Sequence, residues 1–132
     1  MQKVMDASAL LVYLNKETGY EKVEELLVSA AEKNKNILMS AVNWGEVLYI
    51  VQRSLVDYHQ AEAIESIIDT LPIEVIEVDR DLAREAARLK ANHKMAYADC
   101  FAAALAKKRK AELVTSDKEF KAVEDEIKIN WI

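Results

Sequence analysis

Four acidic residues, Asp6, Glu46, Asp99 and Asp117, could together hold a hard divalent cation. If the fold gathered these carboxylates, they would repel one another, and a bound cation would remove that repulsion. Mg²⁺ and Mn²⁺ prefer oxygen ligands. An ion held mainly by carboxylates commonly serves the cleavage or formation of phosphodiester bonds. The four residues therefore predict metal-dependent phosphoryl chemistry, provided that the fold brings them together.

Strand-like and helix-like patterns alternate along the chain. Short apolar runs predict strands at 4–5, 37–39, 73–78, 113–115 and 127–131. Helical spacing of apolar residues predicts helices at 9–14, 20–33, 42–55, 57–70, 82–92 and 97–110, a short helix around Phe120, and Ser40, Asp57 and Asp79 as N-caps. Strands separated by helices favour a parallel sheet covered on both faces. We expect one α/β domain over residues 1–132, with a mainly parallel central sheet of about five short strands flanked by helices.

This topology would bring the four acids to one edge of the sheet, because ligands of open α/β sheets bind beyond the carboxyl ends of the strands. Asp6 ends the first strand, and Asp117 directly follows the fourth. Glu46 lies in the early turns of the helix that leaves the second strand. The helix that carries Asp99 runs antiparallel to the strand after it, so its N-terminal end returns to the same edge. Residues far apart in the sequence are thus predicted to meet.

Each acid also has a purely structural interpretation. Asp6 and Asp117 could cap a helix or a turn, and Glu46 could be exposed. Asp99 could simply favour the positive end of a helix dipole. Its carboxylate, however, lies on a face of small residues suited to close packing, and should therefore be deeply placed and need a partner; these residues are Ala102, Ala103 and Ala106.

Four segments carry these acids in a fixed order: 4–11 (VMDASALL), 43–47 (NWGEV), 98–106 (ADCFAAALA) and 113–120 (LVTSDKEF). In order and spacing they resemble the successive motifs of PIN-domain ribonucleases. The single-domain form resembles the VapC-type toxins of bacterial and archaeal toxin–antitoxin pairs. The resemblance covers essentially the whole chain, and it implies a single PIN-like domain.

The resemblance implies an endoribonuclease that depends on Mg²⁺ or Mn²⁺. Its catalytic, metal-binding acids would be Asp6, Glu46, Asp99 and Asp117. Glu46 could bind the ion or orient the attacking water as a base. The residues that would orient the carboxylates are Ser8, Asn43 and Thr115. Tyr97 departs from the family pattern, which has a smaller residue at this position before Asp99.

The resemblance also implies partners: an RNA substrate, a cognate antitoxin protein and a second copy of the chain in a homodimer. The aromatic residues Trp44, Tyr49 and Tyr58 could belong to the core or line a groove for a partner. A housekeeping PIN nuclease of RNA processing and a non-catalytic PIN-fold interaction module remain open. A haloacid-dehalogenase-like phosphatase is disfavoured, because Ser8 stands where that chemistry needs a second aspartate.

Composition and charge bear on the kind of partner and the cellular compartment that the chain can have. The net charge of −5 does not indicate a nucleic-acid binder, but metal uptake would change the local field at the acids. A single cysteine, Cys100, excludes an internal disulfide and fits a reducing cytoplasm. We expect no signal peptide and no membrane contact, because no apolar run approaches the roughly 20 residues that span a bilayer. The basic run 107–110 is interpreted as a solvated helix end, and His59 and His93 as surface residues.

Overall fold

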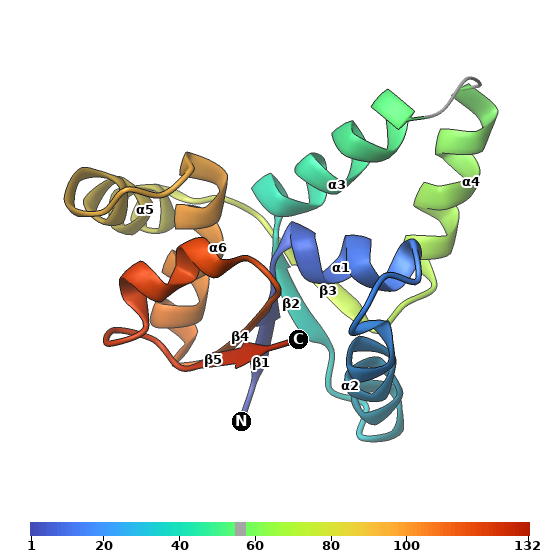
Figure 1. Ribbon diagram of the computed structural model, residues 1–132, viewed down its shortest axis with the longest axis horizontal. Coiled ribbons are helices and arrows are strands. Elements are labelled where there is room, and N and C mark those ends of the chain that lie inside the picture. Colours follow the sequence, from blue (N-terminus) through green and yellow to red (C-terminus); the bar gives the residue numbers. More distant parts are fainter. Residues whose placement is uncertain (55–57) are drawn as a thin grey trace.

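Five short strands form one fully parallel sheet in the order β3-β2-β1-β4-β5 (Figure 1). The structure, a computed structural model, describes residues 1–54 and 58–132. The strands are β1 (Lys3–Met5), β2 (Ile37–Ser40), β3 (Ile73–Ile76), β4 (Glu112–Thr115) and β5 (Ile129–Trp131). The central strand β1 pairs with β2 on one side and β4 on the other. The predicted α/β fold with about five short, mainly parallel strands is confirmed.

Helices cover both faces of the sheet. They are α1 (Ala7–Leu14), α2 (Tyr20–Glu32), α3 (Ala41–Ser54), α4 (Tyr58–Asp69), α5 (Arg80–Asn92), α6 (Tyr97–Arg109) and the 3₁₀ helix η1 (Lys118–Val123). In Figure 1, α5 and α6 lie on one side of the strands and α1 to α4 on the other. No helix in the described part of the chain combines the length and apolar character needed to cross a bilayer.

Two hydrophobic cores, one on each face, hold the layers together. Side chains alternate between the faces along each strand. Val4 and Leu113 therefore pack into the core under α5 and α6, whereas Met5 and Val114 pack into the core under α1 and α2. Burial on both faces explains why these strands read as continuous apolar runs rather than as alternating ones.

Two of the three predicted helix N-caps, Asp79 and Ser40, are confirmed by hydrogen bonds. The Asp79 carboxylate accepts a hydrogen bond from the Leu82 N–H at 2.8 Å and caps α5. Ser40 Oγ accepts from the Val42 N–H at 3.1 Å at the start of α3. The predicted cap at Asp57 lies outside the described residues.

Two strands are shorter than their apolar patterns predict, because an edge strand extends only as far as its partner. β3 pairs with β2 alone, and their ladder ends where Ser40 meets Ile76. β5 pairs with β4 alone, over Ile129–Trp131. The first helix begins earlier than predicted, at Ala7, because Asp6 caps it through the Ala9 N–H at 2.9 Å.

Candidate metal centre

The parallel strands deliver acidic side chains to their carboxyl-terminal edge. Asp6 directly follows β1, and Asp117 lies just beyond β4. The Met5–Val114 register places these two strand ends side by side. Glu46 lies on α3, which leaves β2, and Asp99 lies in the first turn of α6. The electrostatic interactions of Asp99 reach the carboxylates of Asp117, Asp6 and Glu46, so the structure places all four predicted acids in one neighbourhood.

Asp6 is the most buried of them, with 2% of its surface exposed. One oxygen, Oδ1, accepts hydrogen bonds from Ser8 Oγ at 2.8 Å and from the Ala9 N–H at 2.9 Å. The other, Oδ2, accepts from Thr115 Oγ1 at 2.6 Å. A carboxylate has about four lone-pair sites, so these donors leave about one site for a further ligand. Asp6 is thus both the predicted cap of a helix and a rigidly oriented acid.

The hydroxyls that hold Asp6 are themselves oriented by the turn after β4. The Ser116 N–H donates to Ser8 Oγ at 3.1 Å, and the Asp117 N–H donates to Thr115 Oγ1 at 2.9 Å. Because each hydroxyl accepts a backbone N–H, its own proton is directed toward Asp6. The geometry therefore supports the predicted orienting role of Ser8 and Thr115, and it connects the backbone of Asp117 to the carboxylate of Asp6.

Burial and like charge raise the pKa values of two acids. Desolvation raises the pKa of Asp6 to about 6, although the Thr115, Ala9 and Ser8 donors oppose the shift. Desolvation, together with the negative charges of Asp117, Asp6 and other acids, raises the pKa of Asp99 to about 7. No hydrogen bond within residues 1–54 and 58–132 reaches the Asp99 carboxylate. Asp99 is therefore a largely buried acid whose ionised form has no donor from the described chain.

A fifth acid, Glu119, belongs to the same cluster. One ligand oxygen from each of Asp99, Asp117 and Glu119 lies within 4.8 Å of the others. The η1 helix creates this proximity, because the Asp117 carboxylate accepts the Glu119 N–H at 2.9 Å and caps the turn that presents Glu119. Sequence reasoning gave Glu119 no role. The sequence feature that indicates Glu119 is its position two residues after Asp117, an acid that follows a strand. A tight turn there returns the Glu119 side chain to the same group of acids.

Glu46 and Asn43 flank the cluster on α3. Asn43 is fully buried, and its Nδ2 donates to the Ala98 carbonyl at 3.0 Å, which ties α3 to the start of α6. Desolvation raises the pKa of Glu46, whereas the Asn43 amide lowers it. The Asn43 Oδ1 atom is buried without a hydrogen-bond donor among the described residues. Such an acceptor carries a desolvation cost unless a water or ligand donates to it.

The donor set fits a hard divalent cation. Asp99, Asp117 and Glu119 offer carboxylate oxygens, the ligands preferred by Mg²⁺ and Mn²⁺. No ion pair within the described residues neutralises these acids, Asp6 or Glu46. Asp6 and Glu46 stand beside the three-acid cluster rather than within it, and the ligand role of each acid remains a prediction.

Other residues singled out in the sequence have simpler places. Cys100 is free and fully buried in the core. Trp44 packs partly buried against the core, whereas Tyr49 is exposed and lies under the Arg53 guanidinium, 5.0 Å from it. The side chain of Tyr58 lies outside the described part. Tyr97 is 49% exposed and packs against Phe101 with an edge-to-face geometry.

The raised pKa values predict the pH dependence of the metal-free protein. The native state keeps protons on Asp99 and Asp6 up to pH values of about 7 and about 6, whereas the unfolded chain loses them near 3.8. In EDTA, the free energy of unfolding should therefore fall as the pH rises from about 4.5 to 7. Below about pH 4.5 the opposite trend takes over. Lys107, Arg88 and His93 hold the pKa of Glu126 at about 2, so its protonation at low pH destabilises the fold.

The measurement is urea unfolding in EDTA between pH 4.5 and 8, for the wild type and Asp99→Asn. At pH 8 the variant should be more stable by about 1–2 kcal/mol, a value reduced from the full shift because solvent screens an open edge. Its stability should also fall less steeply with pH. Identical pH profiles for the two proteins would contradict the shared acidic field.

The position of Glu119 in the cluster predicts that it contributes to Mn²⁺ affinity. Glu119→Gln should weaken Mn²⁺ binding about tenfold, because it removes one charged ligand from the three-acid cluster. Electron paramagnetic resonance of free Mn²⁺ measures this affinity. The matched control is Glu124→Gln, at an exposed position just after η1 and outside the cluster. Equal affinities of the two variants would remove Glu119 from the site.

Comparisons with known proteins agree with this geometry. The PIN domain family matches residues 3–126. A comparison with curated protein sequences gave no match. Among solved structures, VapBC2 of Rickettsia felis bound to promoter DNA is similar with a TM-score of 0.79 and 22% identity, covering 100% of this chain and 99% of that chain. DNA-bound VapBC of Salmonella typhimurium is similar with a TM-score of 0.74 and 20% identity, and the match covers 98% of this chain and 97% of that chain.

A third similar structure is VapC20 of Mycobacterium tuberculosis, described as a toxin that cleaves the sarcin-ricin loop. It is 19% identical with a TM-score of 0.71, and the match covers 92% of this chain and 95% of that chain. At these identities the likeness shows a shared fold. The family match spans nearly the whole chain and includes Asp6, Glu46, Asp99 and Asp117. The chain therefore belongs to the PIN domain family.

Proposed function

We propose that this protein is an endoribonuclease that requires Mg²⁺ or Mn²⁺ and acts as the toxin of a type II toxin–antitoxin pair. The observation that carries the proposal is the acidic edge. Asp99, Asp117 and Glu119 have oxygens within 4.8 Å of one another, and no ion pair within the described residues neutralises them. Such a cluster is unfavourable by itself and is stabilised by a divalent cation.

Asp99, Asp117 and Glu119 would hold the ion, with Asp6 and Glu46 as further or water-mediated ligands. A bound Mg²⁺ or Mn²⁺ would lower the pKa of a bound water and neutralise charge that develops on the phosphodiester. Asp6 keeps one orientation because the Ser8 and Thr115 hydroxyls donate to it.

Glu46 is the best candidate for the general base. Its raised pKa brings its proton affinity closer to that of a useful base at neutral pH. Glu46 lies on α3 and takes no part in the hydrogen bonds that hold Asp6 at the start of α1, so it can accept a proton without disturbing them. Asn43, one helical turn earlier, would help to orient Glu46, because its amide lowers the pKa of that carboxyl.

The proposed partners follow from the same family. Similar structures include complexes described as VapBC from Rickettsia felis and Salmonella typhimurium, which supports a cognate antitoxin for this chain. We also propose an RNA substrate, a homodimer and a cytoplasmic location. PIN membership leaves no support for the dehalogenase-like phosphatase considered from the sequence.

Expression in a bacterial host tests the toxin role. Induction of the wild type should slow growth, and induction of Asp99→Asn to the same protein level should not. Co-expression of a small protein encoded beside the gene should restore growth by binding the toxin. If the wild type cleaves RNA in vitro with Mn²⁺ but leaves growth unchanged, a housekeeping PIN nuclease replaces the toxin. If it cleaves no RNA with either ion, a non-catalytic interaction module replaces both.

A further inference from the structure

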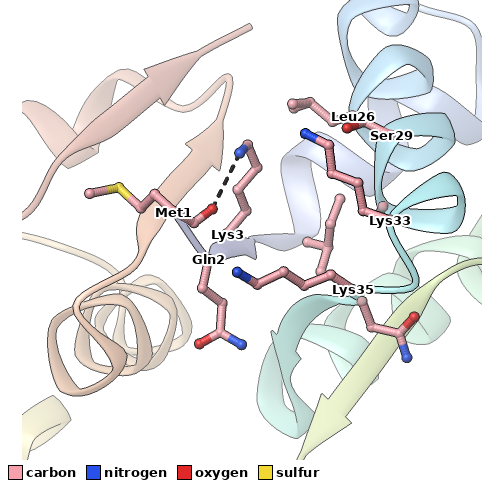
Figure 2. Close-up of a pocket in the computed structure, with 10 residues that line it drawn as sticks. Met1, Gln2, Lys3, Leu26, Ser29, Lys33 and Lys35 are labelled. Atoms are coloured by element: carbon pink, nitrogen blue, oxygen red, sulfur yellow. Dashed lines mark hydrogen bonds between the residues drawn. The ribbon is translucent and has the colours of Figure 1, made fainter.

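A basic cavity lies at the N-terminal ends of the strands, whereas the acids lie at their carboxyl-terminal ends. Its volume is about 210 Å³ (Figure 2). It lies between the start of β1, the last turn of α2 and the segment that leads into β2. The charged side chains that line it are Lys3, Lys33 and Lys35, and its described lining includes no aspartate or glutamate. Lys3 begins β1 and Asp6 directly follows it, so these two positions are about 10 Å apart along the strand.

The end of α2 directs two of these lysines into the cavity. Asn34 adopts a left-handed conformation with φ of 51°. Its N–H donates to the Ala31 carbonyl at 3.2 Å, and the Lys35 N–H donates to the Ala30 carbonyl at 2.9 Å. These two bonds form a Schellman motif, which reverses the chain after the helix. Figure 2 shows the Lys33 and Lys35 ammonium groups extending from this end of α2 toward β1, where Lys3 stands.

The lysines of the cavity, Lys3, Lys33 and Lys35, form no close ion pairs within the described residues. Among the described residues, the Lys3 ammonium makes one long contact, 3.5 Å, with the Met1 carbonyl oxygen. Complementing the helix dipole accounts for one lysine at the C-terminus of α2, because that end carries about half a negative charge. The three positive charges of Lys3, Lys33 and Lys35 exceed the half negative charge of the helix end several-fold. They are gathered at one place although the whole chain has a net charge of −5.

We propose that Lys3, Lys33 and Lys35 form a binding site for a phosphate group, separate from the acidic edge. Ammonium groups bind phosphate as point charges, and the Ser29 hydroxyl and Asn36 amide in the same lining add neutral donors. The volume is below the 300–1,000 Å³ typical of sites that enclose a whole organic ligand. The site therefore takes one phosphate group and leaves the rest of the ligand outside. That group belongs either to a small phosphate compound or to the backbone of an RNA strand.

The first test is an NMR titration of the full chain with inorganic pyrophosphate, in EDTA and at constant ionic strength. EDTA keeps divalent ions from the acidic edge, so the result does not depend on the nuclease proposal. Amide signals of residues 26–37 should shift and saturate. The double variant Lys33→Gln/Lys35→Gln should bind about tenfold more weakly, because two charge-assisted contacts at a partly exposed site are lost. The control Lys94→Gln/Lys121→Gln removes two exposed lysines far from the cavity and should bind as the wild type does.

A second arm identifies the source of the phosphate. A single-stranded RNA with 2′-O-methyl groups replaces pyrophosphate under the same conditions. If RNA shifts residues 26–37 more tightly than pyrophosphate does, the ligand is an RNA backbone; the reverse order identifies a small phosphate compound. Equal affinities of the two double variants for both probes would overturn the site. The site would also be overturned if the amide signals of Lys94 and Lys121 shifted as much as those of residues 26–37. Such a result would show a general attraction of phosphate to surface lysines.

Discussion

Replacing Asp99 by asparagine is expected to lower metal-dependent RNA cleavage by about 10³-fold, the size of effect seen when one strong electrostatic contact to the reacting centre is removed. Asparagine has the same shape as aspartate but no charge. No hydrogen bond within the described residues reaches the Asp99 carboxylate. The substitution therefore removes one negative charge from the cluster with Asp117 and Glu119 while the fold keeps its contacts.

The measurement is the initial rate of RNA cleavage with Mn²⁺ and with Mg²⁺, each repeated in EDTA. Asp125→Asn, the same substitution at an exposed position outside the cluster, is the matched control and should keep the wild-type rate. Wild-type activity in Asp99→Asn would contradict the assignment of this acid, and activity that survives EDTA would contradict the need for a metal.

Asp6 is a less clean position for the same experiment. Its two oxygens accept hydrogen bonds from Ser8, Ala9 and Thr115. An asparagine there turns one acceptor into a donor that faces another donor, and an unsatisfied buried group costs about 1–3 kcal/mol. A loss of cleavage in Asp6→Asn would thus mix a lost charge with a disturbed hydrogen-bond network, which is why Asp99 is the more decisive choice.

Metal binding should stabilise the protein strongly. An ion that binds the native state alone, at about 100 times its dissociation constant, adds roughly 2.7 kcal/mol, or about 8 °C in melting temperature for a domain of this size. The gain should shrink as the pH falls from 7.5 to 5.5, because protons compete for Asp99 and Asp6, whose pKa values are raised to about 7 and about 6.

Melting curves with Mn²⁺ and with EDTA at the two pH values measure this effect. Asp99→Asn should lose most of the metal-induced shift, even though it melts higher than the wild type in EDTA at pH 7.5. This crossover separates loss of a binding site from general damage to the fold. An equal Mn²⁺ shift in the wild type and the variant would show that the ion binds elsewhere.

The alternation of strands and helices was readable from the sequence, because hydrophobic periodicity is a local property. The apolar runs of β1, β2 and β4 and the helical spacing of α2 and α5 all lie within windows of a few residues. Parallel pairing then placed Asp6 and Asp117 at one edge by topology alone. The two shortened strands show where this reasoning ends, because the length of an edge strand depends on its neighbour rather than on its own residues.

The detailed site was decided only by contacts between distant residues. The hydrogen bond from Thr115 to Asp6 joins positions 109 residues apart. Glu119 joins the cluster because a 3₁₀ turn, held by Asp117, points it back to the edge.

The lysine cavity is equally a product of tertiary structure. It requires the register that sets β1 beside β2 and the left-handed turn at Asn34. The amino-acid sequence by itself thus determined the α/β class and the acids that reach the carboxyl edge, because strand ends and helix starts are marked locally. Only the tertiary structure decided which side chains touch there and which cations gather at the other edge, because strand register and turn direction are set by packing across the whole chain.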